Sequence, residues 1–187
     1  MKTVKLSDPK LNTDNWQEFK ISDLFDVVKG KGYNSKEAEE NPGYNNFISA
    51  TSMNNGVAYR TSLENKHKGN RITISSDGAC MDAFYQENSF SCSPSVLVLN
   101  PNFKEFNKYI GLFICVILEL QKIKYHYGRK SNLKRVSKTI IKLPVNELGE
   151  PDYQFMEYYI KILSYSAALN IHNTIDEVIL GDNNEDC

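Results

Sequence analysis

The feature that most constrains the fold is an apolar run of ten residues, Tyr109–Leu118 (YIGLFICVIL). The run is well short of the roughly 20 residues that an α-helix needs to span a bilayer. We interpret it as the centre of a helix, Phe106–Leu120, that is apolar on nearly every face and packs against a sheet. No membrane association is expected, and the rest of the chain must supply the sheet that covers this helix.

Short strands in the first two-thirds of the chain are the expected source of that sheet. Arg71–Ser75 (RITIS) alternates apolar and polar residues, as a half-buried strand does. Asn55-Gly56 is the strongest hairpin signal, and it separates a strand expected at Phe47–Ala50 from its return strand at Val57–Arg60. Further strands are expected at Val27-Val28, Ala83–Tyr85, Val96–Leu99 and Ile140–Val145.

Two short helices and a long one complete the expected elements. We expect Ser22-Asp23 to cap one helical turn, and Ser35 to cap a helix over Ser35–Glu40 that Asn41-Pro42-Gly43 ends. The long helix runs from Tyr153 to about Leu180. It carries an apolar stripe at steps of three and four, formed by Phe155, Tyr158, Ile162, Tyr165 and Leu169. The stripe packs either on its own domain or on another helix, and the sequence leaves both open.

The 187 residues suit one domain with a helical appendage. We expect a flexible lead-in over residues 1–15, a domain over residues 16–150 and the C-terminal helix over residues 151–180. Residues 181–187 form an acidic tail that we expect to be disordered.

Positive charge is concentrated in one segment, Lys122–Lys142, although the net charge of the chain is only −1. The segment holds eight cations and no acid: Lys122, Lys124, Arg129, Lys130, Lys134, Arg135, Lys138 and Lys142. Cations bind phosphates with release of counterions, and the interleaved Tyr127, Ser131 and Asn132 can donate to phosphate or read base edges. The segment predicts a nucleic-acid surface. A solvated basic face without a ligand is the alternative.

Two loops are candidates to join this surface. Lys29-Gly30-Lys31-Gly32-Tyr33 is a basic loop with two glycines that can adopt positive φ, and Lys29 and Lys31 are its candidate contacts. Thr51–Gly56 offers Thr51, Asn54 and Asn55 at a hairpin tip, where they could read bases. Both segments also have the composition of ordinary turns, so an unliganded turn is the alternative for each.

Catalytic, metal and cofactor signatures are absent from the sequence as we interpret it. The three histidines, His67, His126 and His172, have no metal-ligand spacing. Glu64-Asn65-Lys66 lacks the partner residues of a metal-dependent nuclease. The four cysteines form no C-x-x-C pair, which is typical of free thiols in a reducing cytoplasm. We therefore expect a cytoplasmic protein without a cofactor.

Several motifs, in their order along the chain, resemble target-recognition domains of the specificity subunits of Type I restriction-modification systems and their BcgI-like relatives. The similarity runs from about Trp16 to Lys161, and no single motif is decisive. It is carried by Trp16–Lys31, by FISATSMNNGV at Phe47–Val57, by Gly69–Ile74 ahead of Ala83–Gln86, by Asn107–Ile110, by Tyr127–Lys130, by Ile141–Pro144 and by Pro151–Tyr153. The loop Ser75–Met81 departs from the family pattern; its Ser76 is a candidate DNA contact, and its Asp77 would repel phosphate unless it accepts from a cytosine amino group.

The resemblance implies an α/β (α+β) fold: a small, strongly twisted sheet region with packed helices and a projecting C-terminal helix. It implies sequence-specific binding of double-stranded DNA on behalf of a partner methyltransferase subunit and a restriction subunit, with catalysis in those partners. In this family the C-terminal helix packs against another helix, which here would come from a second copy. Full-length specificity subunits have two recognition domains, and this chain has room for one.

A second hypothesis belongs to a different class of function. The domain would be a protein-interaction or decoy module of a restriction complex that no longer binds DNA. The acidic tail and the altered Asp77 loop are the features that favour it.

Overall fold

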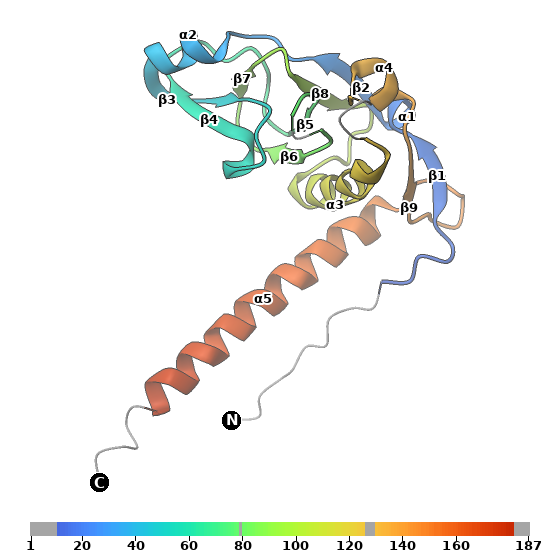
Figure 1. Ribbon diagram of the computed structural model, residues 1–187. Coiled ribbons are helices and arrows are strands. Elements are labelled where there is room, and N and C mark those ends of the chain that lie inside the picture. The colour runs from blue at the N-terminus through green and yellow to red at the C-terminus, as the bar shows by residue number, and fades with distance from the viewer. Residues whose placement is uncertain (1–10, 79, 126–129, 182–187) are drawn as a thin grey trace.

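The structure is a computed structural model that describes residues 11–181 except Ala79 and residues 126–129, with the side chains of 169, 170 and 172–181 also outside the description. It is a mixed α and β fold with a long C-terminal helix (Figure 1), so the expected fold class is confirmed. No helix among the described residues has the length and apolar character that crossing a membrane requires.

A four-stranded antiparallel sheet lies under the buried helix. Its order is β2 (Phe25–Lys29), β8 (Val96–Pro101), β5 (Arg71–Ser75) and β6 (Ala83–Gln86). Helix α3 (Lys108–Glu119) packs on it and buries Ile110, Ile114 and Leu118 among the apolar strand residues of the larger core. The apolar run therefore forms the predicted sheet-packed helix, which begins two residues later than expected because Asn107 caps it.

A second, three-stranded sheet has the order β4 (Val57–Thr61), β3 (Pro42–Ile48) and β7 (Phe90–Cys92). Strands β3 and β4 are the expected antiparallel pair, joined through the 3₁₀ turn η1 (Asn54–Gly56), and β7 runs parallel to β3. Strand β7 was not predicted, since it has only three residues and lies in a Ser-rich stretch.

The two ends of the domain meet in a two-stranded sheet of β1 (Gln17–Lys20) and β9 (Ile140–Leu143). Beside it lie the single turn α1 (Ile21–Leu24) and the short helix α4 (Leu133–Ser137), which follows the 3₁₀ segment η2 (Leu120–Lys124) along the chain. The sequence predicted neither β1 nor α4, because neither stands out in periodicity.

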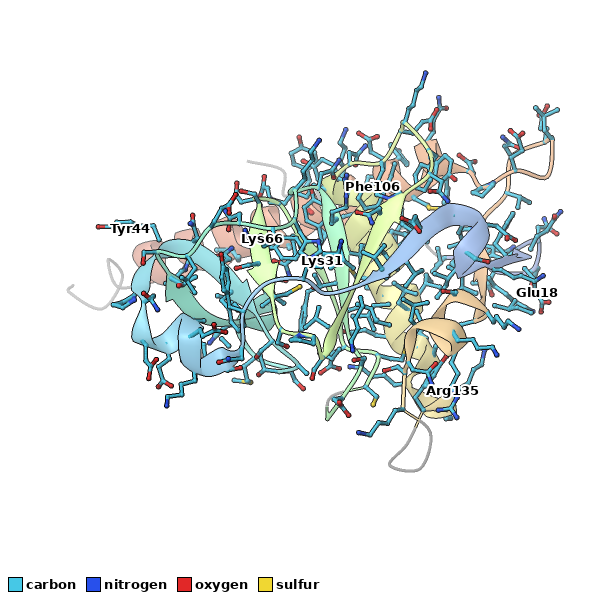
Figure 2. All side chains as sticks on the ribbon, turned by 90° about the horizontal axis from the view of Figure 1, so that it is seen from above. Glu18, Lys31, Tyr44, Lys66, Phe106 and Arg135 are labelled. Carbon is cyan, nitrogen blue, oxygen red and sulfur yellow. The ribbon has the colours of Figure 1, made fainter. Side chains whose placement is uncertain are left out.

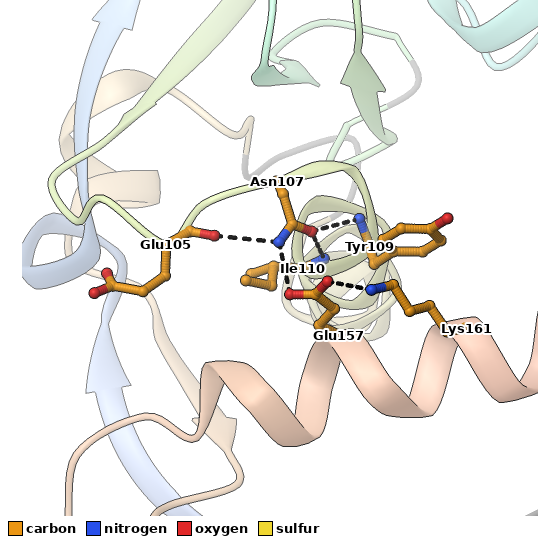
Figure 3. Close-up of polar contacts among 6 residues, drawn as sticks. All are labelled: Glu105, Asn107, Tyr109, Ile110, Glu157 and Lys161. Carbon is orange, nitrogen blue, oxygen red and sulfur yellow. Dashed lines mark hydrogen bonds and ion pairs between the residues drawn. The ribbon is translucent and has the colours of Figure 1, made fainter.

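Helix α5 (Tyr153–Gly181) begins on the domain and then extends away from it as one long rod (Figure 1). Its first turns pack against α3, where the Tyr159 ring meets Phe113 edge to face at 6.1 Å between centroids. Asn107 joins the two helices, since its Nδ2 donates to Glu157, which in turn pairs with Lys161 at 2.5 Å (Figure 3). The base of α5 is thus fastened to the N-terminal end of α3.

Three local expectations were wrong. Helix α2 (Ser35–Glu40) is capped by Asn34, not Ser35: the Asn34 side chain accepts from the Glu37 amide, and the Glu37 carboxylate accepts from the Asn34 amide. Helix α1 begins at Ile21, so Ser22-Asp23 lies within it and does not cap it. Strand β3 begins at Pro42, whereas it was expected to begin at Phe47. The first five residues were missed because they lack the apolar character of the strand's buried end.

Candidate nucleic-acid interface

The basic glycine loop that follows β2 lies directly against β8 and the segment before it. The Gly30 amide donates to the Val96 carbonyl at 2.7 Å, and a Cβ at Gly30 would lie 2.5 Å from the Ser93 carbonyl oxygen. Only glycine fits this close approach without moving the backbone. Because Gly30 is buried and fixed, Lys29 and Lys31 on either side of it are both held at the exposed surface.

A hollow of about 370 Å³ opens beside this loop. Four of the predicted DNA contacts line it, from three separate segments: Lys29, Ser76, Lys130 and Asn132. Asp77, Pro94, Ser95, Leu97 and Leu133 complete the wall. Residues that are up to about a hundred positions apart in sequence are therefore brought together. Lys29, Lys130 and Asn132 can donate a hydrogen bond to a ligand, whereas the Ser76 hydroxyl donates to the Ser95 carbonyl at 2.8 Å and offers a ligand its acceptor capacity.

Asp77 adds a carboxylate to the lining of this hollow. Its Oδ1 lies 2.5 Å from the Lys130 ammonium, and both side chains are about half exposed. Along the same basic segment, Lys122 pairs with the buried Asp82 and with Glu119. The segment that is free of acids in sequence is therefore not free of them in space, and its local positive charge is smaller than the count of cations predicts.

Helix α4 presents a second group of cations. Lys134, Arg135 and Lys138 are exposed around a hollow of about 520 Å³, which Lys124, Tyr125, Thr139 and Ile140 also line. The helix turns these cations outward because Val136 is its buried residue, and Figure 2 shows Arg135 on the outer side. The Asn132 side chain caps α4 by accepting from the Arg135 amide at 3.0 Å, so its Nδ2 is the group left to donate to a ligand.

Ser131 is not available for the base contact that the sequence predicted. The residue is completely buried, and its hydroxyl donates to the Ser75 carbonyl at 2.8 Å. This bond fastens the start of the α4 segment to the end of β5. Ser131 is therefore not a base contact, and its role in the structure is to position its neighbours Lys130 and Asn132.

The turn at Thr51–Gly56 lies next to the loop that carries Ser76 and Asp77. A Cβ at Gly78 would be 3.9 Å from the Ala50 carbonyl oxygen, which places the two segments in contact. Asn54 and Asn55 both have positive φ, and the Asn55 Nδ2 donates to the Tyr85 carbonyl at 3.0 Å. Asn54 and Asn55 are both exposed, and one N–H of the Asn55 amide holds the turn to β6.

Two predicted contacts, Tyr127 and Arg129, lie outside the described residues. One residue that the sequence did not single out as a contact lies at the candidate surface. His67 accepts a hydrogen bond from the Lys31 amide at 2.9 Å across 36 positions of sequence, and no sequence signal could have found it. Asp77, which was expected to repel phosphate unless it accepts from cytosine, lies in the wall of the hollow as the partner of Lys130.

The described residues contain no group of three or more His, Cys, Asp or Glu side chains arranged to hold a metal ion. The chemistry of the hollow and of α4 is that of exposed cations, amides and hydroxyls around one carboxylate. Such a surface binds phosphates through its cations and can distinguish hydrogen-bond donors from acceptors on a base edge.

The apolar stripe predicted for α5 is divided between two environments. Phe155 is half-buried and stacks on Tyr159 at 5.8 Å, while the side chains of Tyr158 and Tyr165 are 62% and 68% exposed. Ile162 is partly exposed, and the side chain of Leu169 lies outside the described residues. Met156, which the predicted stripe does not contain, is completely buried in the core of the domain.

Residues 13–175 match the model of the family described as Type I restriction modification DNA specificity domain. The chain is 36% identical over 146 residues to the Type II restriction enzyme specificity subunit S.BcgI of Heyndrickxia coagulans. This match covers 78% of the chain and 42% of that protein. It is 29% identical over 140 residues to a putative type I specificity subunit of Mycoplasma pneumoniae, over 72% of this chain and 45% of that protein.

Solved structures show the same fold. The S subunit of a Type I restriction-modification system from M. genitalium superposes with a TM-score of 0.62 at 16% identity, over 91% of this chain and 44% of that one. The HsdS subunit of Thermoanaerobacter tengcongensis gives a TM-score of 0.56 at 16% identity, over 88% and 41%. The chain thus spans less than half the length of each of these four relatives.

Proposed function

Because the chain belongs to the family of Type I restriction modification DNA specificity domains, we propose that it binds double-stranded DNA sequence-specifically as the recognition component of a restriction-modification system. One observation carries the proposal beyond family membership. Lys29, Ser76, Lys130 and Asn132 converge from three segments on one hollow, and the cations of α4 follow directly after Asn132.

Within this proposal the side chains divide into two roles. Lys29, Lys31, Lys134, Arg135 and Lys138 bind phosphates, which fix the position of the domain on the duplex but carry no sequence information. Asn132, Ser76, Thr51 and Asn54 contact base edges. Asp77 can accept from the amino group of cytosine, and its pairing with Lys130 offsets the repulsion that a lone carboxylate would exert on phosphate.

The partners follow from the same premise. A methyltransferase subunit and a restriction subunit supply catalysis, and the chain itself acts as a non-catalytic specificity component in the cytoplasm. We assign recognition to residues 16–150 and assembly to residues 151–180. A second copy completes the assembly through α5, since the exposed Tyr158 and Tyr165 lie seven residues apart on one face of the projecting helix.

Selection of bound duplexes from a random library tests the proposal, followed by gel shifts with the winning sequence at low and physiological salt. Enrichment of one sequence is the expected result. Absence of retention even at low salt would contradict DNA recognition and favour the protein-interaction module. Cleavage of the duplex by the purified chain with Mg²⁺ would contradict the non-catalytic role.

A further inference from the structure

Three hydrogen bonds hold the basic glycine loop against the two sheets. The Gly30 amide donates to the Val96 carbonyl, and the Cys92 amide donates to the Lys31 carbonyl at 3.4 Å. The third bond is of another kind, because the Lys31 amide donates to a side chain, the Nε2 of His67, at 2.9 Å. The conformation of the loop at Lys31 therefore depends on the protonation state of the His67 imidazole.

The imidazole is itself fixed by the end of the three-stranded sheet. His67 and Phe90 form an isolated antiparallel bridge, with N–H to O distances of 2.8 and 3.0 Å. The His67 ring also stacks on the Phe90 ring, with 5.2 Å between centroids and 19° between planes. Because the backbone and the ring of His67 are both held in place, the side chain keeps one rotamer, in which Nε2 faces the Lys31 amide.

Only the neutral form of the ring can accept this bond. A neutral imidazole has one acceptor nitrogen, whereas both nitrogens of the imidazolium are donors. Protonation of His67 would therefore set an N–H against the Lys31 N–H and abolish the contact. We propose that His67 is a positioning residue that holds the loop Lys29–Gly32 in its DNA-binding conformation and releases it on protonation. This inference rests on the proposed DNA-binding function.

The surroundings of His67 favour the neutral ring at pH 7. Burial is the largest influence on the pKa of His67 and lowers it below its ordinary value of about 6.5; the backbone hydrogen bond with Lys31 acts against this shift, and the charge of Lys31 acts with it. Lys66 and Lys68 flank it in sequence. Glu64 is the nearest acid of this segment, and it is engaged with Lys66, whose ammonium also lies 5.8 Å from the Tyr33 ring centroid. The Cys92 thiol beside Lys31 is neutral, because burial raises its pKa to about 12.

Release of the loop weakens DNA binding because Lys29 and Lys31 must then be ordered when the duplex binds. One net hydrogen bond corresponds to about a fivefold change in affinity. The new charge on His67 attracts phosphate and acts in the opposite direction. We assign the larger effect to loop order, since the His67 ring stacks on Phe90 and is only partly exposed to a bound phosphate.

The experiment compares the full chain with His67→Gln, whose amide oxygen accepts a hydrogen bond but does not titrate. His172→Gln is the matched control, because it removes a histidine on the projecting part of α5. Duplex affinity is measured at constant salt at several pH values from 8 down to 4.5, because the lowered pKa places protonation of His67 below pH 6.5. We expect the wild type and the control to lose up to about fivefold more affinity than His67→Gln on acidification. An equal loss in all three proteins overturns the inference.

A measurement without DNA separates this inference from the proposed function. The amide resonance of Lys31 and its hydrogen exchange are followed by NMR across the same pH range in the free protein and in His67→Gln. We expect a pH-dependent shift in the wild type only, together with a fall in the protection of the Lys31 amide once exchange rates are corrected for their intrinsic dependence on pH. Failure of every variant to bind duplex at any of these pH values would contradict the proposed function, and a Lys31 amide that ignores pH would contradict the role of His67.

Discussion

The sharpest consequence of the proposed interface concerns the salt dependence of DNA binding by α4. Lys134 and Lys138 are exposed on this helix and line the same hollow, while the residue that fastens α4 to the core is Val136. Replacing both lysines with alanine therefore removes two charges without disturbing packing. We expect the double variant Lys134→Ala/Lys138→Ala to bind duplex more weakly and with a shallower dependence on salt.

The magnitude follows from counting phosphates. Each phosphate neutralised by a protein cation contributes about 0.9 to the slope of log affinity against log salt concentration, so two lost contacts lower the slope by about 1.8. Between 50 mM and 200 mM salt, the wild type should consequently lose about twelvefold more affinity than the double variant. Alanine is also a good helix former, so α4 should persist.

Fluorescence anisotropy with a labelled duplex at several salt concentrations measures this slope directly. The matched control is Lys36→Ala/Lys104→Ala, which removes the same charge from α2 and from the loop ahead of α3. Neither control lysine lines the two hollows. An unchanged slope in the α4 variant, or an equal drop in the control, would refute the placement of DNA on α4 and reduce the cations to a solvated basic face.

Further predictions concern the scaffold and the assembly. Gly30→Ala should lower the free energy of unfolding by about 1–3 kcal/mol in chemical denaturation, because the new methyl group meets the Ser93 carbonyl oxygen, and an unchanged midpoint would contradict this packing. Tyr165→Glu should abolish concentration-dependent self-association in sedimentation equilibrium, and a dimer that survives it would show that α5 does not pair through this face. Cys92 and Cys115 should resist alkylation of the native protein at pH 8, since burial raises the pKa of both thiols, and their rapid modification would contradict the buried placement.

Elements with strong local sequence patterns were predicted correctly. The alternation of RITIS gave β5 with both of its ends correct, and the apolar run gave the buried α3. Elements with weak local patterns were not predicted. Strand β7 and helix α4 have three and five residues, and such short elements are stabilised by their neighbours more than by their own propensity.

The candidate site shows the same division. Lys130 and Asn132 could be identified from the charge and composition of their segment, but the bond from Ser131 to Ser75 could not, because it joins residues 56 positions apart. The count of cations also overstated the positive charge. Carboxylates that are remote in sequence, such as Asp77, are brought beside these cations by the packing of the loops.

The sequence alone determined the strands and helices that have strong local patterns and the residue types of the candidate surface, because periodicity and composition act over a few neighbouring positions; the kind of fold followed from the resemblance to a known family. Only the tertiary structure decided which of those residues face one hollow, which are spent on holding loops, and that His67 supports the backbone of Lys31. The physical reason is that hydrogen bonds and ion pairs depend on distances of a few ångströms in space, and a folded chain sets these distances independently of separation along the sequence.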